Sequence, residues 1–138
     1  MASLSQAASD LIKELREVQE NLSLCYQATL YEVGELLVYY TPIDTGLASS
    51  NWNVGNLGQI SIEREPIEGV KGLAALRAIS GQVKHVNMEL DAYFRNPVDY
   101  IGDLDKGKSR QALGGMIVPT MSRVDDIWLS NAKKYKLI

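Results

Sequence analysis

The sequence predicts an α+β protein in which a long N-terminal helix, a central helix and a C-terminal helix pack around a small antiparallel β-sheet. Apolar residues recur with helical spacing over residues 1–40, and helical spacing returns at 68–83 and near the C-terminus. Between them, two short segments alternate apolar and polar residues, as strands do. The length of 138 residues predicts a single domain, with a helix over 1–40 and an α+β body over 41–138.

The first element is a helix with one apolar stripe. Ser3 and Gln6 have the spacing of a capping box, and no proline interrupts before Pro42. About 35 helical residues span on the order of 50 Å, which exceeds what a small core needs. Two outcomes stay open: part of the stripe packs on another subunit, or the N-terminal half simply protrudes or frays. The stripe comprises Leu4, Ala8, Leu11, Leu15, Val18, Leu22, Cys25, Thr29, Val33, Leu36 and Tyr40, of which Leu11, Leu15, Val18 and Leu22 are the candidate helix interface.

A turn follows the helix. Pro42 ends the helix, Asp44 is suited to bond backbone amides two residues on, and Gly46 accepts a positive φ. Residues 47–54 and 59–65 flank a glycine-containing connection, and Ile60 and Ile62 alternate with polar residues. This pair of segments predicts a β-hairpin.

The remaining elements are shorter. Residues 68–83 have helical spacing interrupted by glycines, and residues 89–97 alternate like a strand that Pro97 ends. Ile117 and Val118 fit either a strand or the start of the last helix. Residues 124–136 predict a short amphipathic helix whose lysines suit its negative C-terminal end.

The stretch from Gly102 to Ser109 matches the phosphate-binding P-loop pattern, with Gly107 and Lys108 in the required places. A P-loop follows a buried parallel strand and opens a helix. Here the preceding residues are short and polar, and two carboxylates would lie inside the phosphate cradle. We therefore interpret the match as accidental.

Other chemical sites are sparse. One cysteine, Cys25, and one histidine, His85, are too few for a zinc site or an internal disulfide, and Cys25 falls on the apolar stripe. We expect no catalytic site, no metal and no cofactor. The net charge of −3 also disfavours a protein that grips DNA. No signal peptide or membrane span is evident, so we expect assembly in a cytosol.

Two segments resemble motifs of tailed-phage head–tail joining proteins, also called tail-completion, neck or minor tail proteins. The first motif is carried by Pro42, Asp44, Thr45, Gly46, Leu47, Ser50 and Trp52, with Leu47 one place earlier than in many members. The second is carried by Asn96, Tyr100, Leu104, Asp105, Gly107, Ser109, Gln111, Ala112, Gly115 and Met116, with Leu113 where the family usually has proline. Each motif alone is modestly specific, and their shared order strengthens the resemblance.

The resemblance implies a structural virion protein without enzymatic activity, located in the neck at the top of the tail and assembled in the host cytoplasm. Such proteins form a homo-oligomeric ring, commonly sixfold. The implied partners are a portal-adaptor or head-completion protein on one side and the tail tube or tail terminator on the other. Genomic DNA passes through the ring without sequence-specific binding, and no membrane is involved.

The loop at residues 106–111 is the second candidate contact. It carries three basic residues on a chain of negative net charge, so it either meets an acidic face of a neighbour or is merely solvated. Its members are Lys106, Gly107, Lys108, Ser109, Arg110 and Gln111. Alternative functions are a tail terminator ring, a small cytosolic adaptor that pairs its long helix with a partner, and the disfavoured nucleotide binder.

Overall fold

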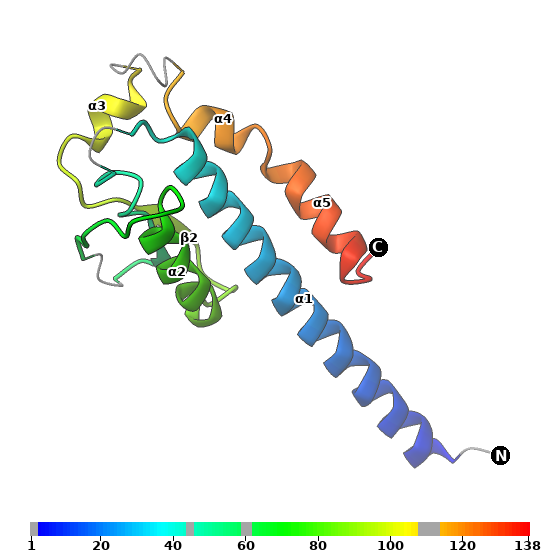
Figure 1. Cartoon of the computed structure of the whole chain (residues 1–138). Helices are drawn as coiled ribbons and strands as arrows, with labels where there is room; N and C mark the ends of the chain where they lie inside the picture. The colour runs from blue at the N-terminus through cyan, green and yellow to red at the C-terminus, as the bar shows by residue number, and fades with distance from the viewer. Residues whose placement is uncertain (1–2, 44–45, 59–61, 108–113) are drawn as a thin grey trace.

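The computed structural model describes residues 3–43, 46–58, 62–107 and 114–138, and it has the predicted α+β fold with mostly helical content. A two-stranded antiparallel sheet and several short helices surround one end of a long helix (Figure 1). In chain order the elements are α1 (Leu4–Tyr40), β1 (Asn53–Asn56), α2 (Leu73–Gln82), the 3₁₀ helix η1 (Val83–His85), β2 (Ala92–Arg95), α3 (Ile101–Asp105), α4 (Ile117–Met121) and α5 (Val124–Lys134).

Helix α1 confirms the prediction of a long N-terminal helix, and local signals define both of its ends. The Ser3 side chain accepts a hydrogen bond from the backbone N–H of Gln6 at 3.1 Å, which satisfies one free donor of the first turn. The Gln6 side chain donates to Asp10 at 3.0 Å, so only half of the capping box forms. At the other end Thr41 is extended, with ψ 127°, immediately before Pro42.

The predicted hairpin between residues 47–54 and 59–65 is wrong, because β1 pairs with β2 instead. The register places Asn53 opposite Arg95 and Asn56 opposite Ala92. Residues 62–67 form no strand, and the Ile62 side chain is exposed. Residues 59–61 lie outside the described part of the chain.

The two segments of the predicted hairpin nevertheless meet, through side chains rather than a backbone ladder. The Asn51 amide donates to the Arg64 carbonyl at 2.8 Å and accepts from the Arg64 N–H at 2.6 Å. The Arg64 guanidinium donates to the carbonyls of Ser50 and Trp52, and burial lowers its pKa below the ordinary value. These bonds satisfy polar groups that a second ladder would otherwise satisfy.

Helix α2 starts later than the predicted range of 68–83. Gly69 and Gly72 have φ of 114° and 66°, outside the right-handed helical region, so the helix begins at Leu73. The strand predicted over 89–97 is confirmed in its centre as β2, whereas Leu90 lies before the strand and is exposed. Of the two alternatives for Ile117 and Val118, the helical one is observed.

The core lies between the C-terminal half of α1, helix α2 and the small sheet. Helix α5 runs alongside α1. The N-terminal half of α1 extends past α2 and α5 into solvent (Figure 1). Buried core residues are Leu30, Val33, Leu37, Val38, Trp52, Val54, Ala75, Ile79, Val83 and Met116. The chain therefore has a body with one core and a projecting helical segment.

Candidate interaction surfaces

The projecting segment, Leu4–Leu22 of α1, is called the arm below. Every residue from Ser3 to Glu20 is exposed. The candidate interface residues Leu11, Leu15 and Val18 are each more than half exposed, and Leu22 is 37% exposed. The structure thus places all four on the arm, where no described part of the chain buries them.

The same stripe is buried where α1 enters the body. Cys25 is fully buried, and this burial raises the pKa of its thiol above the ordinary value. The next stripe residue, Thr29, accepts a hydrogen bond at 3.1 Å from the Asn131 side chain of α5. Helix α5 therefore covers the inner part of a stripe whose outer part is open.

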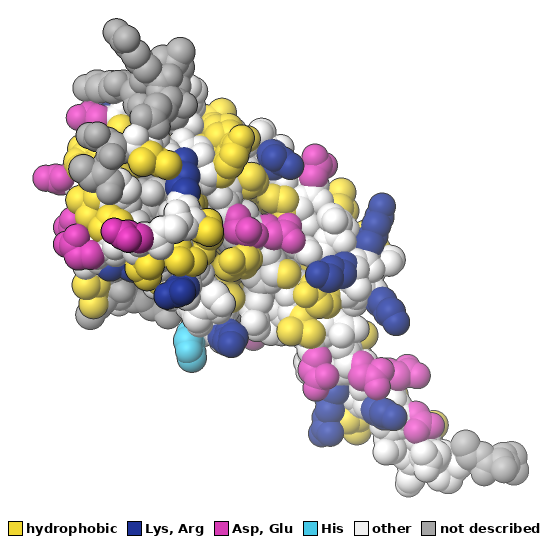
Figure 2. Space-filling view, viewed as in Figure 1, with side chains coloured by type: hydrophobic (Ala, Val, Ile, Leu, Met, Phe, Trp, Pro, Cys, Tyr) yellow, Lys and Arg dark blue, Asp and Glu magenta, His cyan; other side chains and the backbone are white. Residues whose placement is uncertain are grey.

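One flank of the arm is acidic. Glu14 borders the apolar stripe on the side opposite Ile12, and Asp10 and Glu17 follow at helical spacing further around the same side of the helix. Figure 2 shows carboxylates gathered on the arm next to fewer basic side chains. The arm therefore combines an apolar stripe with carboxylates on one adjoining side of the helix.

The segment of residues 42–52, the first of the two motif segments quoted above, holds the body together at the end of α1. Gly46 has the predicted positive φ, 82°, and its carbonyl accepts from the Ser50 N–H. The buried Trp52 donates its indole N–H to the Thr41 hydroxyl at 2.8 Å, which ties β1 to the end of α1. Pro42 follows Thr41 at this junction, whereas Asp44 and Thr45 lie outside the described residues.

The second motif contacts the first through Asn96. Its side chain donates to the Ala48 carbonyl at 2.8 Å and accepts from the Val98 N–H at 3.1 Å. The bond to Ala48 joins two segments that are 48 residues apart in sequence. It therefore packs the two motif segments together inside the body.

The base of the candidate basic loop is closed by Asp105. One carboxylate oxygen of Asp105 accepts from the N–H groups of Met116 and Ile117, both at 3.0 Å. Gly115 has φ 74°, and a Cβ at this position would lie 2.1 Å from the Asp105 carbonyl oxygen. Lys106 is exposed at the start of the loop and Gly107 has a positive φ. Lys108, Ser109, Arg110 and Gln111 lie outside the described residues.

The described surroundings of the P-loop pattern differ from those of a phosphate site. Gly102 lies inside α3, whereas in a P-loop the first glycine precedes the helix. The sheet formed by the described residues is antiparallel, and β2 ends well before α3. Asp105, in the middle of the pattern, caps the segment that begins α4.

The structure adds a shallow groove that the sequence did not reveal. It has a volume of about 260 Å³ and crosses α1 just C-terminal to the arm. Its lining residues are Leu24, Gln27, Ala28 and Tyr31 of α1, Ser80 of α2, Val83 of η1, and Tyr135 after α5. The only sequence signal was Leu24, an apolar residue that lies off the main stripe and is 48% exposed.

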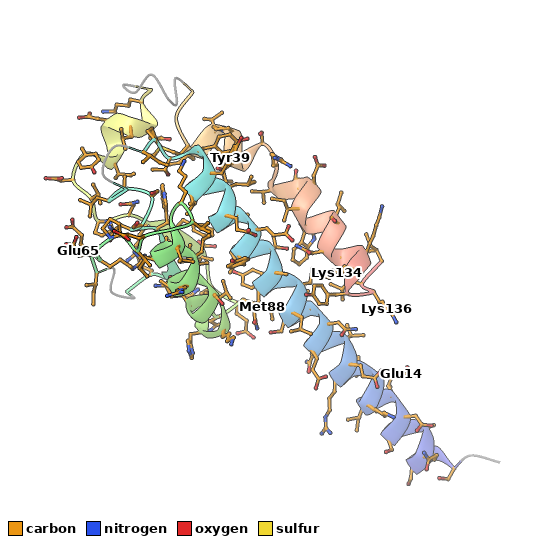
Figure 3. The ribbon with its side chains drawn as sticks, viewed as in Figure 1. Glu14, Tyr39, Glu65, Met88, Lys134 and Lys136 are labelled. Atoms are coloured by element: carbon orange, nitrogen blue, oxygen red, sulfur yellow. The ribbon has the colours of Figure 1, made fainter. Side chains whose placement is uncertain are left out.

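Three lysines are next in sequence to residues that line this groove. Lys84 follows Val83 in sequence, and Lys134 and Lys136 flank Tyr135; all three are exposed. Figure 3 shows Lys134 and Lys136 at the end of α5 and Glu14 further out on the arm. A tight turn fixes this end of α5: Lys136 has φ 59°, and the Leu137 N–H donates to the Ala132 carbonyl at 2.8 Å.

Other kinds of site find no support in the described residues. Among them, no group of three His, Cys, Asp or Glu side chains could hold a metal ion, and His85 is exposed. None of their helices has the length and apolar character needed to cross a membrane. Comparison with protein-family models, curated proteins and solved structures finds no match.

Proposed function

We propose that this chain is a non-enzymatic structural protein of a tailed-phage virion, forming a homo-oligomeric ring at the head–tail interface. The ring would join the portal-adaptor complex to the tail, with DNA passing through it. The single observation that carries the proposal is the arm, which exposes a continuous apolar stripe from Leu4 to Leu22.

Physical chemistry favours a partner for the arm. Contiguous exposed apolar surface of this kind marks interaction sites in proteins that otherwise remain dispersed in water. The stripe continues into a region that the chain buries itself, at Cys25 and Thr29. A face that is already suited to helix packing thus remains open for a second molecule.

The family motifs give the arm its proposed context. Trp52 and Asn96 connect the two motif segments to α1 and to each other, so the motifs build the body from which the arm projects. This architecture supports a role in which the body forms the ring wall and the arm forms contacts between subunits.

The proposal is tested by disrupting the gene in the phage or prophage that encodes it. We expect DNA-filled heads and separate tails, and full restoration by the wild-type gene. The double variant Leu11→Asp/Leu15→Asp should fail to restore joined particles, because it places charges on the stripe. Joined, infectious particles after disruption would contradict the proposal.

A matched control places the same residue type on the outward face of the arm. Lys13→Asp/Glu20→Asp changes two exposed positions that lie away from the stripe, and it should restore joined particles. Cross-linking of the particles then separates the alternatives. Contacts between copies of this chain support the ring, whereas contacts only with a different protein favour a helical adaptor.

The basic loop is tested separately. Lys108→Glu/Arg110→Glu reverses two of its charges, and a contact with an acidic neighbour predicts loss of tail attachment. Unchanged attachment would mean that the loop is solvated. In either case the arm remains the primary contact in this proposal.

A further inference from the structure

The arm and the groove have complementary chemistry. The arm offers an apolar stripe with Glu14 at its border and with Asp10 and Glu17 further around the same side of the helix. The groove offers apolar and aromatic side chains, including Leu24 and Tyr135, and three lysines are next in sequence to its lining residues. The apolar stripe of the arm suits the apolar lining of the groove, and the carboxylates of the arm are opposite in charge to the lysines.

We propose that the arm of one copy docks in the groove of a neighbouring copy. This inference rests on the proposed ring and names the surface that receives the arm. The contact is heterologous, because an arm meets a groove rather than another arm. Repetition of such a contact closes a ring when the rotation between neighbours divides a full turn.

A chain cannot fill its own groove. Helix α1 is continuous from Leu4 to Tyr40, and Leu24 and Tyr31 of the groove belong to the same helix as the arm. The arm therefore points away from the groove of its own chain (Figure 1). Only a second molecule can bring an arm to it.

Pairing of two arms is less favoured. The open stripe from Leu4 to Leu22 covers fewer than three heptads, which is short for an independent coiled coil. The positions that border the stripe, where a coiled coil selects its partner by charge, hold only one charged residue, Glu14. The others are Ser5, Ala7, Ile12, Gln19 and Asn21.

Electrostatics favours the groove as the partner. The residues next in sequence to the groove lining include Lys84, Lys134 and Lys136 but a single carboxylate, Glu32. An arm whose Glu14 side faces these lysines brings opposite charges together. The contact should therefore weaken as salt concentration rises.

The inference is tested by mixing two defective chains. The arm variant is Leu11→Asp/Leu15→Asp, and the groove variant is Leu24→Asp/Lys134→Glu, at two exposed positions. By sedimentation at low salt, wild type should form closed oligomers and each variant alone should be monomeric. An equimolar mixture should give a 1:1 dimer, because only one intact arm and one intact groove remain per pair.

Three results would overturn the inference. The groove variant alone could assemble like wild type, as arm–arm pairing requires. The mixture could remain monomeric while wild type assembles. Wild type could stay monomeric even at millimolar concentration and low salt.

A charge exchange keeps the test independent of folding defects. Glu14→Lys/Glu17→Lys should weaken assembly about tenfold or more, because lysines would then face lysines. Adding Lys134→Glu/Lys136→Glu to the same chain should restore most of the loss. Absence of rescue, with normal circular dichroism, would contradict the charged contact. If assembly follows these rules but particles join without the chain, the proposed function fails and the docking inference stands.

Discussion

Leu15 and Val33 lie on the same face of one helix, yet the Leu15 side chain is 55% exposed and the Val33 side chain is 5% exposed. Both belong to one apolar stripe that recurs with helical spacing along α1. The difference is that α2 and α5 lie against the inner half of α1 and stop before the arm. Periodicity therefore identifies the apolar face of a helix but not the chain that covers it.

The largest expected difference between the two halves is in folding stability. Leu37→Ala should lower the free energy of unfolding by about 2–5 kcal/mol, because Leu37 is buried in the core. Leu11→Ala should change it by less than about 0.5 kcal/mol, because Leu11 is exposed. Denaturant unfolding at low protein concentration measures both. Equal losses of unfolding free energy in the two variants would contradict the division of α1 into a buried half and an exposed arm.

A second test examines the part of the body far from the arm. Gly115→Ala should destabilise the fold by about 2 kcal/mol or more, because an alanine there has an unfavourable φ and meets the Asp105 carbonyl. A methyl group added at the neighbouring Gly114 would meet no atom within 4 Å, so Gly114→Ala should have little effect. Similar melting temperatures for the two variants would show that the Asp105 contact does not hold the base of the loop.

A third variant separates folding from assembly. Lys136 has φ 59°, so Lys136→Gly should stabilise the body by about 1 kcal/mol by removing backbone strain. The same change removes a basic residue beside the groove, so it should weaken assembly. Lys133→Gly, inside the last turn of α5, should instead destabilise by about 1 kcal/mol. Destabilisation by Lys136→Gly would argue against the turn seen here.

The smallest expected effect concerns pH. Burial, and secondarily the Glu32 carboxylate, raise the pKa of Glu35 above its ordinary value of 4.5. The folded chain therefore holds this proton more tightly than the unfolded chain, and that contribution to stability is lost as pH rises above about 4.5. Glu35→Gln should raise the free energy of unfolding at pH 7 by only about a few tenths of a kcal/mol, since the side chain is exposed to solvent. An equal gain in the free energy of unfolding at pH 4 would exclude the raised pKa of Glu35 as its cause.

Elements defined by neighbouring residues were predictable. Ser3, Pro42 and Gly46 act through the backbone within a few residues of themselves, so the ends of α1 and the positive φ of Gly46 could be predicted from sequence. The exposure of the outer stripe is compatible with both outcomes left open for it, and its role in a ring stays a prediction.

Features built from distant residues were not predictable. The partner of β1 depends on Asn56, whose amide donates to the carbonyls of Asn87 and Asp91 just before β2. The groove needs α1, η1 and the residue after α5 together. The Asp105 cap likewise bridges the whole length of the loop. Such long-range pairings leave no local pattern in a single sequence.

Amide hydrogen exchange across a dilution series tests the central claim most directly, because it reports on both halves of α1 at once. At concentrations where wild type is assembled, amides of the arm should be protected, and that protection should disappear as dilution yields monomers. Amides from Cys25 to Tyr40 should stay protected throughout. Arm amides that exchange freely in the assembled oligomer, or that remain equally protected in the monomer, would contradict the assignment of the outer stripe to a neighbouring molecule.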